Sequence, residues 1–136
     1  MDEERIDSII RSIESYEDTL KALNIKNLKE YKEADIKTKS TAERHLQLIS
    51  DLEQDILLLL YKSLFKLSPV DIKDVIHKLS GTFEDNVIES IKKRKRLRNR
   101  LVHAYMEGMY DEEVFEQLKD LSDVDGFLSA AKKIKK

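Results

Sequence analysis

One short segment of the chain gathers the side chains best suited to chemistry. Residues 98–105 include Arg98, Asn99 and His103. The imidazole of His103 can remove the proton of a ribose 2′-hydroxyl or protonate a 5′-leaving oxygen. The guanidinium of Arg98 can bind the phosphate with parallel hydrogen bonds and stabilise the charge that grows on its oxygens. Because the 2′-hydroxyl supplies the nucleophile, these two side chains suffice for RNA cleavage without a metal.

Helical spacing relates these side chains to one another. At ~100° per residue, Asn99 and His103 share a face, so the Asn99 amide can hydrogen-bond one ring nitrogen and fix the tautomer. Arg98 lies ~140° from His103 on an ideal helix, although its long side chain can swing towards the same groove. A site shared by two chains would bring these two residues together more easily. His45 and His77 lack such neighbours, and we interpret both as surface or partly buried side chains.

The charge of the chain is concentrated around this segment. Seven of the ten residues 91–100 are Lys or Arg, whereas the rest of the chain carries 18 basic and 27 acidic residues. A basic run on an acidic body predicts a local site for an anion, unless the run is only a solvated face. Because a helix distributes its side chains around the axis, we expect three or four of them to contact RNA phosphates. The candidates are Lys92, Lys93, Arg94, Lys95, Arg96 and Arg100.

Several classes of site have no signature in the sequence. There is no cysteine, no Gly-rich phosphate loop, no His-x-x-x-His and no acidic cluster with ligand spacing, so we expect neither a metal nor a cofactor. Residues 2–5 are charged and no apolar stretch follows Met1, so the N-terminal segment does not resemble a secretory signal. The longest apolar run, Ile56–Tyr61, is far shorter than the ~20 residues of a membrane span. We therefore expect a cytoplasmic protein that makes no use of a membrane.

Apolar residues recur at helical spacing along most of the 136 residues, and no segment alternates with period two. The spacing predicts helices over about 3–23, 28–35, 40–65, 69–80, 83–109 and 111–134. The sequence therefore predicts one domain, 1–136, folded as an all-α, antiparallel up-and-down bundle of four main helices plus short segments. The run Leu57–Leu60 is apolar all round, which indicates either the middle of the bundle or a subunit interface.

Capping residues define several of the predicted helix ends. Asn27 with Glu30 is typical of a capping box. Ser68, followed by Pro69, predicts an N-cap with proline at the first helical position. Asp111 is expected to cap the last helix, which would then run without interruption to residue 134.

The spacing of Arg98, His103 and Tyr105 resembles the Arg-x4-His-x-Tyr signature of HepT-type toxins in the HEPN superfamily. The Tyr110-Asp111 step and the segment 43–56 are also similar to that family. The resemblance implies a helical dimer that brings two motifs into one cleft, with Arg98 and His103 catalytic and Asn99 supporting them. It also implies a minimal nucleotidyltransferase antitoxin as partner, which can transfer AMP to the motif tyrosine, here Tyr105.

These observations leave more than one function open. The first is a metal-independent endoribonuclease toxin of a type II/VII-like toxin–antitoxin system. The alternative is a catalytically silent HEPN-type binding module that presents substrate or nucleotide to a partner nucleotidyltransferase. A helical adaptor with an incidental basic patch is a third. Arg98, Asn99 and His103 favour the enzyme, since a scaffold has no need of these three side chains together.

Overall fold

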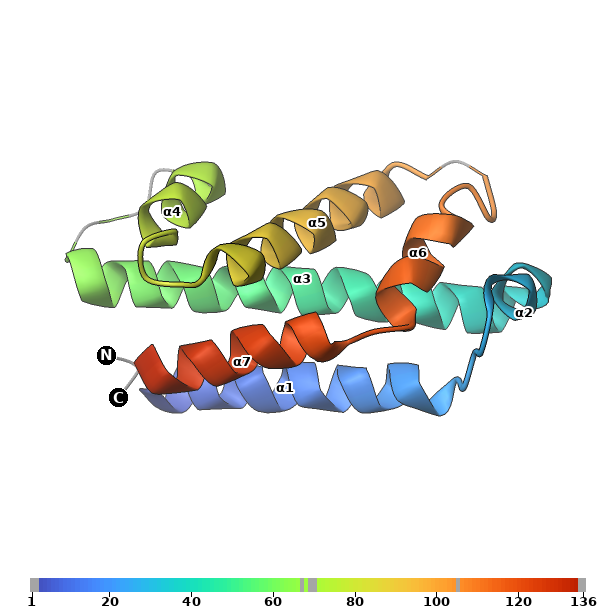
Figure 1. The fold of residues 1–136 in the computed structure, drawn as a ribbon, viewed down its shortest axis with the longest axis horizontal. Coiled ribbons are helices and arrows are strands. Elements are labelled where there is room, and N and C mark those ends of the chain that lie inside the picture. Colours follow the sequence, from blue (N-terminus) through green and yellow to red (C-terminus); the bar gives the residue numbers. More distant parts are fainter. Residues whose placement is uncertain (1–2, 67, 69–70, 105, 135–136) are drawn as a thin grey trace.

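The computed structural model describes residues 3–66, 68, 71–104 and 106–134. These residues form helices and no strand, which confirms the all-α bundle (Figure 1). The four main helices are α1 (Glu3–Ala22), α3 (Ile36–Phe65), α5 (Asp85–Val102) and α7 (Ser122–Ile134). Three short helices lie between them: α2 (Leu28–Glu33), α4 (Ile72–Leu79) and α6 (Asp111–Leu118).

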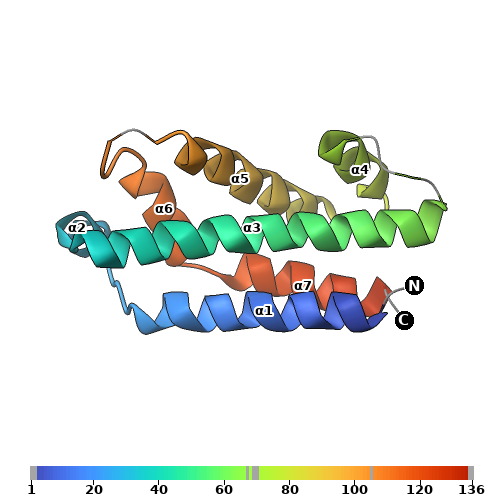
Figure 2. The same cartoon turned by 180° about the vertical axis from the view of Figure 1, so that it is seen from behind.

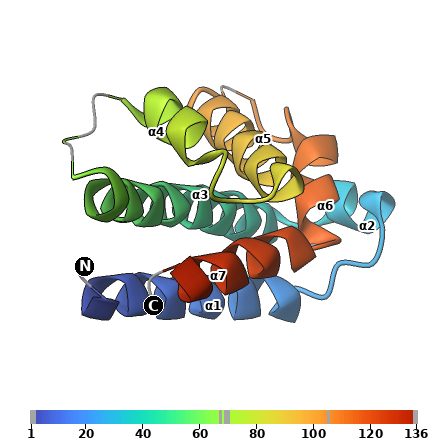
Figure 3. The same ribbon diagram turned by 60° about the vertical axis from the view of Figure 1, so that its left-hand side comes forward.

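Helix α3 is the central element of the bundle. It packs against α1 on one side and against α4 and α5 on the other, as Figures 1 and 2 show from opposite directions. The oblique view in Figure 3 shows α7 lying beside α1, and α7 also contacts α5. Within the run Leu57–Leu60, both end residues are fully buried and the two between them are half-buried. The run therefore lies in the middle of the bundle, while Leu58 and Leu59 keep a partly exposed face.

Two predicted helix starts differ in their outcome. Asn27 is the N-cap of α2, where its side chain accepts a hydrogen bond from the Glu30 amide at 2.8 Å, as predicted. The N-cap of α4 is Asp71, whose carboxylate accepts from the Asp74 amide at 2.8 Å. The prediction of Ser68 as this cap is therefore wrong, because the carboxylate that lies next to the first helical residue satisfies the exposed amide. Pro69, part of the same prediction, lies outside the described residues.

The predicted helix over 83–109 is too long, because α5 ends at Val102. The chain then turns through Gly108, which has a φ of +77° that favours glycine. It returns to the bundle at Asp111, whose buried carboxylate lies 3.0 Å from the ammonium of Lys39 on α3. Asp111 is thus the first residue of α6 and an ion-pair partner, where the sequence had predicted a cap.

The prediction of one uninterrupted last helix over 111–134 is also wrong, because the chain forms two helices there, α6 and α7. Between them, the carboxylate of Asp120 accepts a hydrogen bond from the Ser122 amide at 2.9 Å. This bond satisfies an amide at the start of α7 and supports the change of direction. The break lets Leu121 and Val124 reach the core next to α5.

A buried ion pair joins α3 to α5. Arg94 donates from Nε to one oxygen of Glu53 at 2.7 Å and from Nη2 to the other at 2.6 Å. Arg94 also donates to the Ser90 hydroxyl at 3.2 Å. Burial raises the pKa of the Glu53 carboxyl, and the charge and hydrogen bonds of Arg94 oppose that rise. Because both charges are out of water, either one alone would be costly.

Removal of one partner of this pair should destabilise the fold. We expect Arg94→Ala to lower the free energy of unfolding by about 3–5 kcal/mol, because it leaves the Glu53 carboxylate buried and unpaired. The double change of Glu53→Leu with Arg94→Met should cost less than Arg94→Ala alone. Lys92→Ala, on the exposed face of the same helix, should stay within about 0.5 kcal/mol of the unchanged chain. Urea denaturation measures all three, and an Arg94→Ala protein as stable as the unchanged chain would contradict the structural role of the pair.

A second buried carboxyl lies where α1 meets α7. Glu17 is 2% exposed, and its Oε2 has no hydrogen-bond partner in the described part of the chain. Burial raises the pKa of Glu17 from 4.5 to about 8, and a hydrogen bond with Asp125 and the charge of that residue add to the effect. The positive charge of Lys21 opposes the shift, whereas the negative charge of Glu14 adds to it. At neutral pH, Glu17 is therefore protonated and can share its proton with Asp125.

The raised pKa of Glu17 predicts a pH-dependent stability. The folded chain holds a proton that the unfolded chain releases near pH 4.5, so this contribution is complete below that pH and is lost as the pH rises through about 8. Glu17→Gln keeps the site neutral, and at pH 8.5 it should raise the free energy of unfolding by about 1–3 kcal/mol. Glu33→Gln removes the same charge from an exposed position at the end of α2, outside the set of charges that shift Glu17, and should keep the original pH dependence. Identical pH profiles for Glu17→Gln and the unchanged chain would refute this assignment.

Candidate active site

Helix α5 carries the motif and is fixed by its buried face. Ile91, Arg94, Leu97 and Leu101 recur at helical spacing and are buried against the rest of the bundle. Arg98, four residues beyond Arg94, lies at the edge of this face and is half-buried. The last turn of α5 therefore presents the motif at the boundary between core and solvent.

Arg98 is held by an acidic residue of α3. Its Nε donates to Oδ1 of Asp51 at 2.8 Å, and the two side chains are 33% and 41% exposed. Sequence reasoning did not identify Asp51. It also missed Glu53, although an acid at the position between Ile49 and Ile56 on the apolar stripe of α3 is a visible signal of a buried partner.

Asn99 and His103 lie on the exposed surface at the end of α5. His103 is the C-cap residue, and its backbone N–H donates to the carbonyl of Arg100 at 3.0 Å. No side-chain hydrogen bond joins Asn99 to His103 in the described structure. His103 is nonetheless one turn beyond Asn99, and both side chains are accessible to a ligand. Tyr105 lies outside the described residues.

The structure divides the basic run into different environments. Arg94 is buried with Glu53, so the prediction that it contacts RNA is wrong: its guanidinium is part of the core. Lys92 is exposed and lies 3.6 Å from Glu89, one turn away. At ~100° per residue, Lys93, Arg96 and Arg100 face one side of α5, whereas Lys95 and Asn99 face the other.

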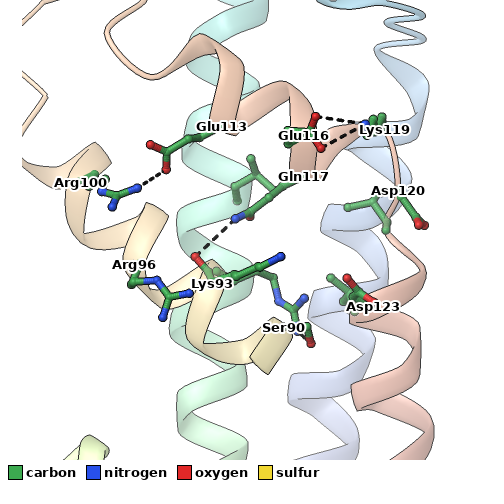
Figure 4. Close-up of a pocket in the computed structure, with 14 residues that line it drawn as sticks. Ser90, Lys93, Arg96, Arg100, Glu113, Glu116, Gln117, Lys119, Asp120 and Asp123 are labelled. Carbon is green, nitrogen blue, oxygen red and sulfur yellow. Dashed lines mark hydrogen bonds and ion pairs between the residues drawn. The ribbon is translucent and has the colours of Figure 1, made fainter. Parts of the chain in front are cut away.

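A pocket of about 440 Å³ lies between α5, α6 and the start of α7 (Figure 4). Lys93, Arg96 and Arg100 line it from α5, and Arg100 pairs with Glu113 across its mouth. The amide of Gln117 donates to the carbonyl of Lys93 at 3.4 Å. Four carboxylates and one further lysine also line it: Glu113, Glu116, Asp120, Asp123 and Lys119. The pocket therefore has mixed charge, and it does not include Arg98, Asn99 or His103 among its lining residues.

The motif is instead flanked by exposed apolar side chains. Val102, Met106 and Met109 are large hydrophobic residues on the surface, within a few residues of His103 in the chain. The structure thus places the mixed-charge pocket apart from Arg98, which is held by Asp51 of α3, and from His103, which is exposed at the end of α5.

Two kinds of feature are absent from the part of the chain that the structure describes. No three His, Cys, Asp or Glu side chains lie together in a way that could hold a metal ion in residues 3–66, 68, 71–104 and 106–134. None of the helices described in the structure is both long enough and apolar enough to cross a bilayer.

Comparison with known proteins identifies the family of the chain. Residues 5–131 match the family described as Ribonuclease HepT-like. No match was found among curated proteins or among solved structures. The matched range includes residues 98–103 with the motif and reaches from the first turn of α1 into the last turns of α7. The all-α bundle agrees with this match. The chain belongs to the HepT-like ribonuclease family.

Proposed function

We propose that the chain is a metal-independent endoribonuclease and the toxin of a type II/VII-like toxin–antitoxin system. One observation carries the proposal within this ribonuclease family. Arg98 is tethered through Nε alone, and its terminal nitrogens have no partner in the described structure, while His103, five residues further along the chain, is exposed. A guanidinium fork and an imidazole are the two groups that cleavage by the 2′-hydroxyl requires.

The reaction follows from these groups. An imidazole takes the proton of the 2′-hydroxyl, whose oxygen forms a bond to phosphorus, and the bond from phosphorus to the 5′-oxygen breaks. A second imidazole, or the same one once protonated, gives a proton to the 5′-oxygen. The guanidinium of Arg98 stabilises the negative charge on the non-bridging oxygens. The products are a 2′,3′-cyclic phosphate and a 5′-hydroxyl.

The proposed enzyme is a homodimer with two motifs in one cleft. The exposed side chains of Val102, Met106 and Met109 support this arrangement, because a second copy would cover them. Two copies would also provide two His103 side chains, one as base and one as acid. Asn99 is placed between Arg98 and His103 in the motif, and its role is to support them at the cleft.

Cleavage should depend on His103 and not on a metal. We expect the purified chain to cut RNA in excess EDTA and to leave 2′,3′-cyclic phosphate ends. His103→Ala should reduce the rate by about 10²–10⁴, the usual cost of losing a general acid or base. His77→Ala, which changes an exposed histidine on α4, should leave the rate unchanged. Gel analysis of labelled RNA and of its termini measures each result.

Several outcomes of this assay would contradict the proposal. Loss of cleavage in EDTA, or full activity of His103→Ala, would refute the mechanism. An inactive unchanged chain that still binds a nucleotidyltransferase would favour the catalytically silent binding module. Light scattering on the same sample tests the homodimer: a monomer at micromolar concentration with full activity would exclude it. In a dimer, mixtures with Arg98→Ala should lose activity out of proportion to their composition.

The exposed basic residues of α5 are proposed to hold the RNA. We expect Lys92, Lys93, Lys95, Arg96 and Arg100 to supply three or four phosphate contacts, each adding about −0.7 to the slope of log affinity against log salt. Lys92→Glu with Arg96→Glu should weaken binding and reduce the steepness of that slope. Lys132→Glu with Lys133→Glu makes the same charge change at the end of α7 and should do less. A salt-insensitive affinity would show that the run is only a solvated face.

Control of the nuclease is proposed to act at Tyr105, two residues beyond His103. A minimal nucleotidyltransferase would join the phenol oxygen of Tyr105 to the α-phosphorus of ATP, with release of pyrophosphate and of the phenol proton. The added AMP brings a negative phosphate next to the motif. It would compete with the RNA phosphate for Arg98, so one modification would block both binding and chemistry.

Removal of the Tyr105 hydroxyl tests this proposed regulation. Tyr105→Phe should keep most of the nuclease activity but escape neutralisation by a co-expressed nucleotidyltransferase. Tyr110→Phe, at the next tyrosine along the chain, should be neutralised like the unchanged chain. Intact mass should show AMP additions that map to Tyr105. If those additions are absent, the antitoxin must act by covering the toxin.

A further inference from the structure

The way in which Arg98 is bound sets it apart from the other paired arginines of α5. A guanidinium carries one N–H on Nε and four on its two terminal nitrogens. Arg98 uses Nε on one oxygen of Asp51, at 2.8 Å. Neither terminal nitrogen of Arg98 has a hydrogen-bond partner among the residues that the structure describes. Four of its donors are therefore available to a ligand.

The two neighbouring pairs on α5 use their arginines differently. Arg94 places both Nε and Nη2 on Glu53, and both side chains are buried. Arg100 pairs through Nη1, one of its terminal nitrogens, with Glu113. In the described pairs of this helix, only Arg98 is tethered through Nε alone, with its terminal edge unoccupied. That edge is the one that binds a phosphate with two parallel hydrogen bonds.

The position of Asp51 is fixed by the core. Glu53, two residues further along α3, is held in the buried pair with Arg94, and Arg98 follows Arg94 by about one helical turn. Because α3 and α5 run antiparallel, Asp51 is brought opposite Arg98. Ile49 and Ser50 beside it are buried, so the backbone at Asp51 has little freedom.

We infer that Asp51 is a positioning residue of the nuclease. It holds Nε of Arg98 so that both terminal nitrogens face the RNA phosphate as a preorganised fork. The inference rests on the proposed function, because it assigns Asp51 a part in that same site. Charge alone predicts the opposite effect on binding. An acid beside an RNA site repels phosphate, so removal of the Asp51 carboxylate would by charge alone strengthen RNA binding.

Measurement of kcat and KM for the full chain on RNA separates the positioning of Arg98 by Asp51 from the repulsion of phosphate by the Asp51 charge. Asp51→Ala should lower kcat by about 10- to 100-fold, as expected for a displaced catalytic group, while KM stays the same or falls. Asp51→Asn keeps an oxygen that can accept from Nε and should restore most of kcat. Asp55→Asn removes the same charge one turn along α3 and should leave kcat unchanged. Thermal unfolding should be the same for all three variants.

A double-mutant cycle completes the test. In the Arg98→Ala background, Asp51→Ala should cause no further loss, because Asp51 acts only through Arg98. A kcat of Asp51→Ala equal to that of the unchanged chain, or an additive loss in the cycle, overturns the inference and leaves the nuclease standing. Full cleavage by Arg98→Ala, or none by the unchanged chain, overturns the proposed function and the role of Asp51 with it.

Discussion

The buried ion pair between Glu53 and Arg94 determines where α5 lies on α3. Apolar contacts between two helices tolerate small shifts along their axes, because one aliphatic side chain substitutes well for another. Two parallel hydrogen bonds between a guanidinium and a carboxylate do not tolerate such shifts. A pair of this kind adds little net stability over a well-packed apolar contact. Its value here is specificity of register, on which the position of Arg98 depends.

A second buried pair holds the far side of the site. Lys39 at the start of α3 binds Asp111 at 3.0 Å, where the chain returns to the bundle after the motif. A Cβ at Gly108 would lie 3.1 Å from Oδ2 of Asp111, and the φ of Gly108 is +77°. The segment after His103 is thus bounded by the end of α5 and by this tightly packed return. Each of the two buried pairs joins residues that are far apart in the sequence, and one partner of each pair belongs to α3.

The sequence predicted the helices better than it predicted their ends. Apolar spacing predicts α1, α3 and α5 because each buries one continuous stripe. After α5 ends at Val102, the chain returns to the bundle at Asp111, which pairs with Lys39, 72 positions away in the sequence. No local pattern predicts this long-range pair. The break before α7 has a local signal, because Asp120 accepts from the Ser122 amide, but the apolar spacing continues across the break and therefore predicted one helix.

For the candidate site, residue types were easier to predict than their surroundings. The spacing of Arg98 and His103 is visible in the sequence, and so is the excess of positive charge. The burial of Arg94 was predictable in principle, since it occupies the apolar stripe of α5 and Glu53 occupies that of α3. The contact of Arg98 with Asp51 was not, because α3 carries three acids outside the core, Glu43, Asp51 and Asp55. Which of them meets Arg98 depends on how two helices pack.

The arrangement of the first and last helices has a practical consequence. The start of α1 and the end of α7 lie together at one end of the bundle, while the last turn of α5 points towards the other (Figure 1). Ends that lie close together are commonly tolerant of linkage and of circular permutation. A short linker between the two would allow new termini to be opened elsewhere on the surface. A chain permuted in this way could carry a fluorophore or a surface tether without crowding the edge that holds His103.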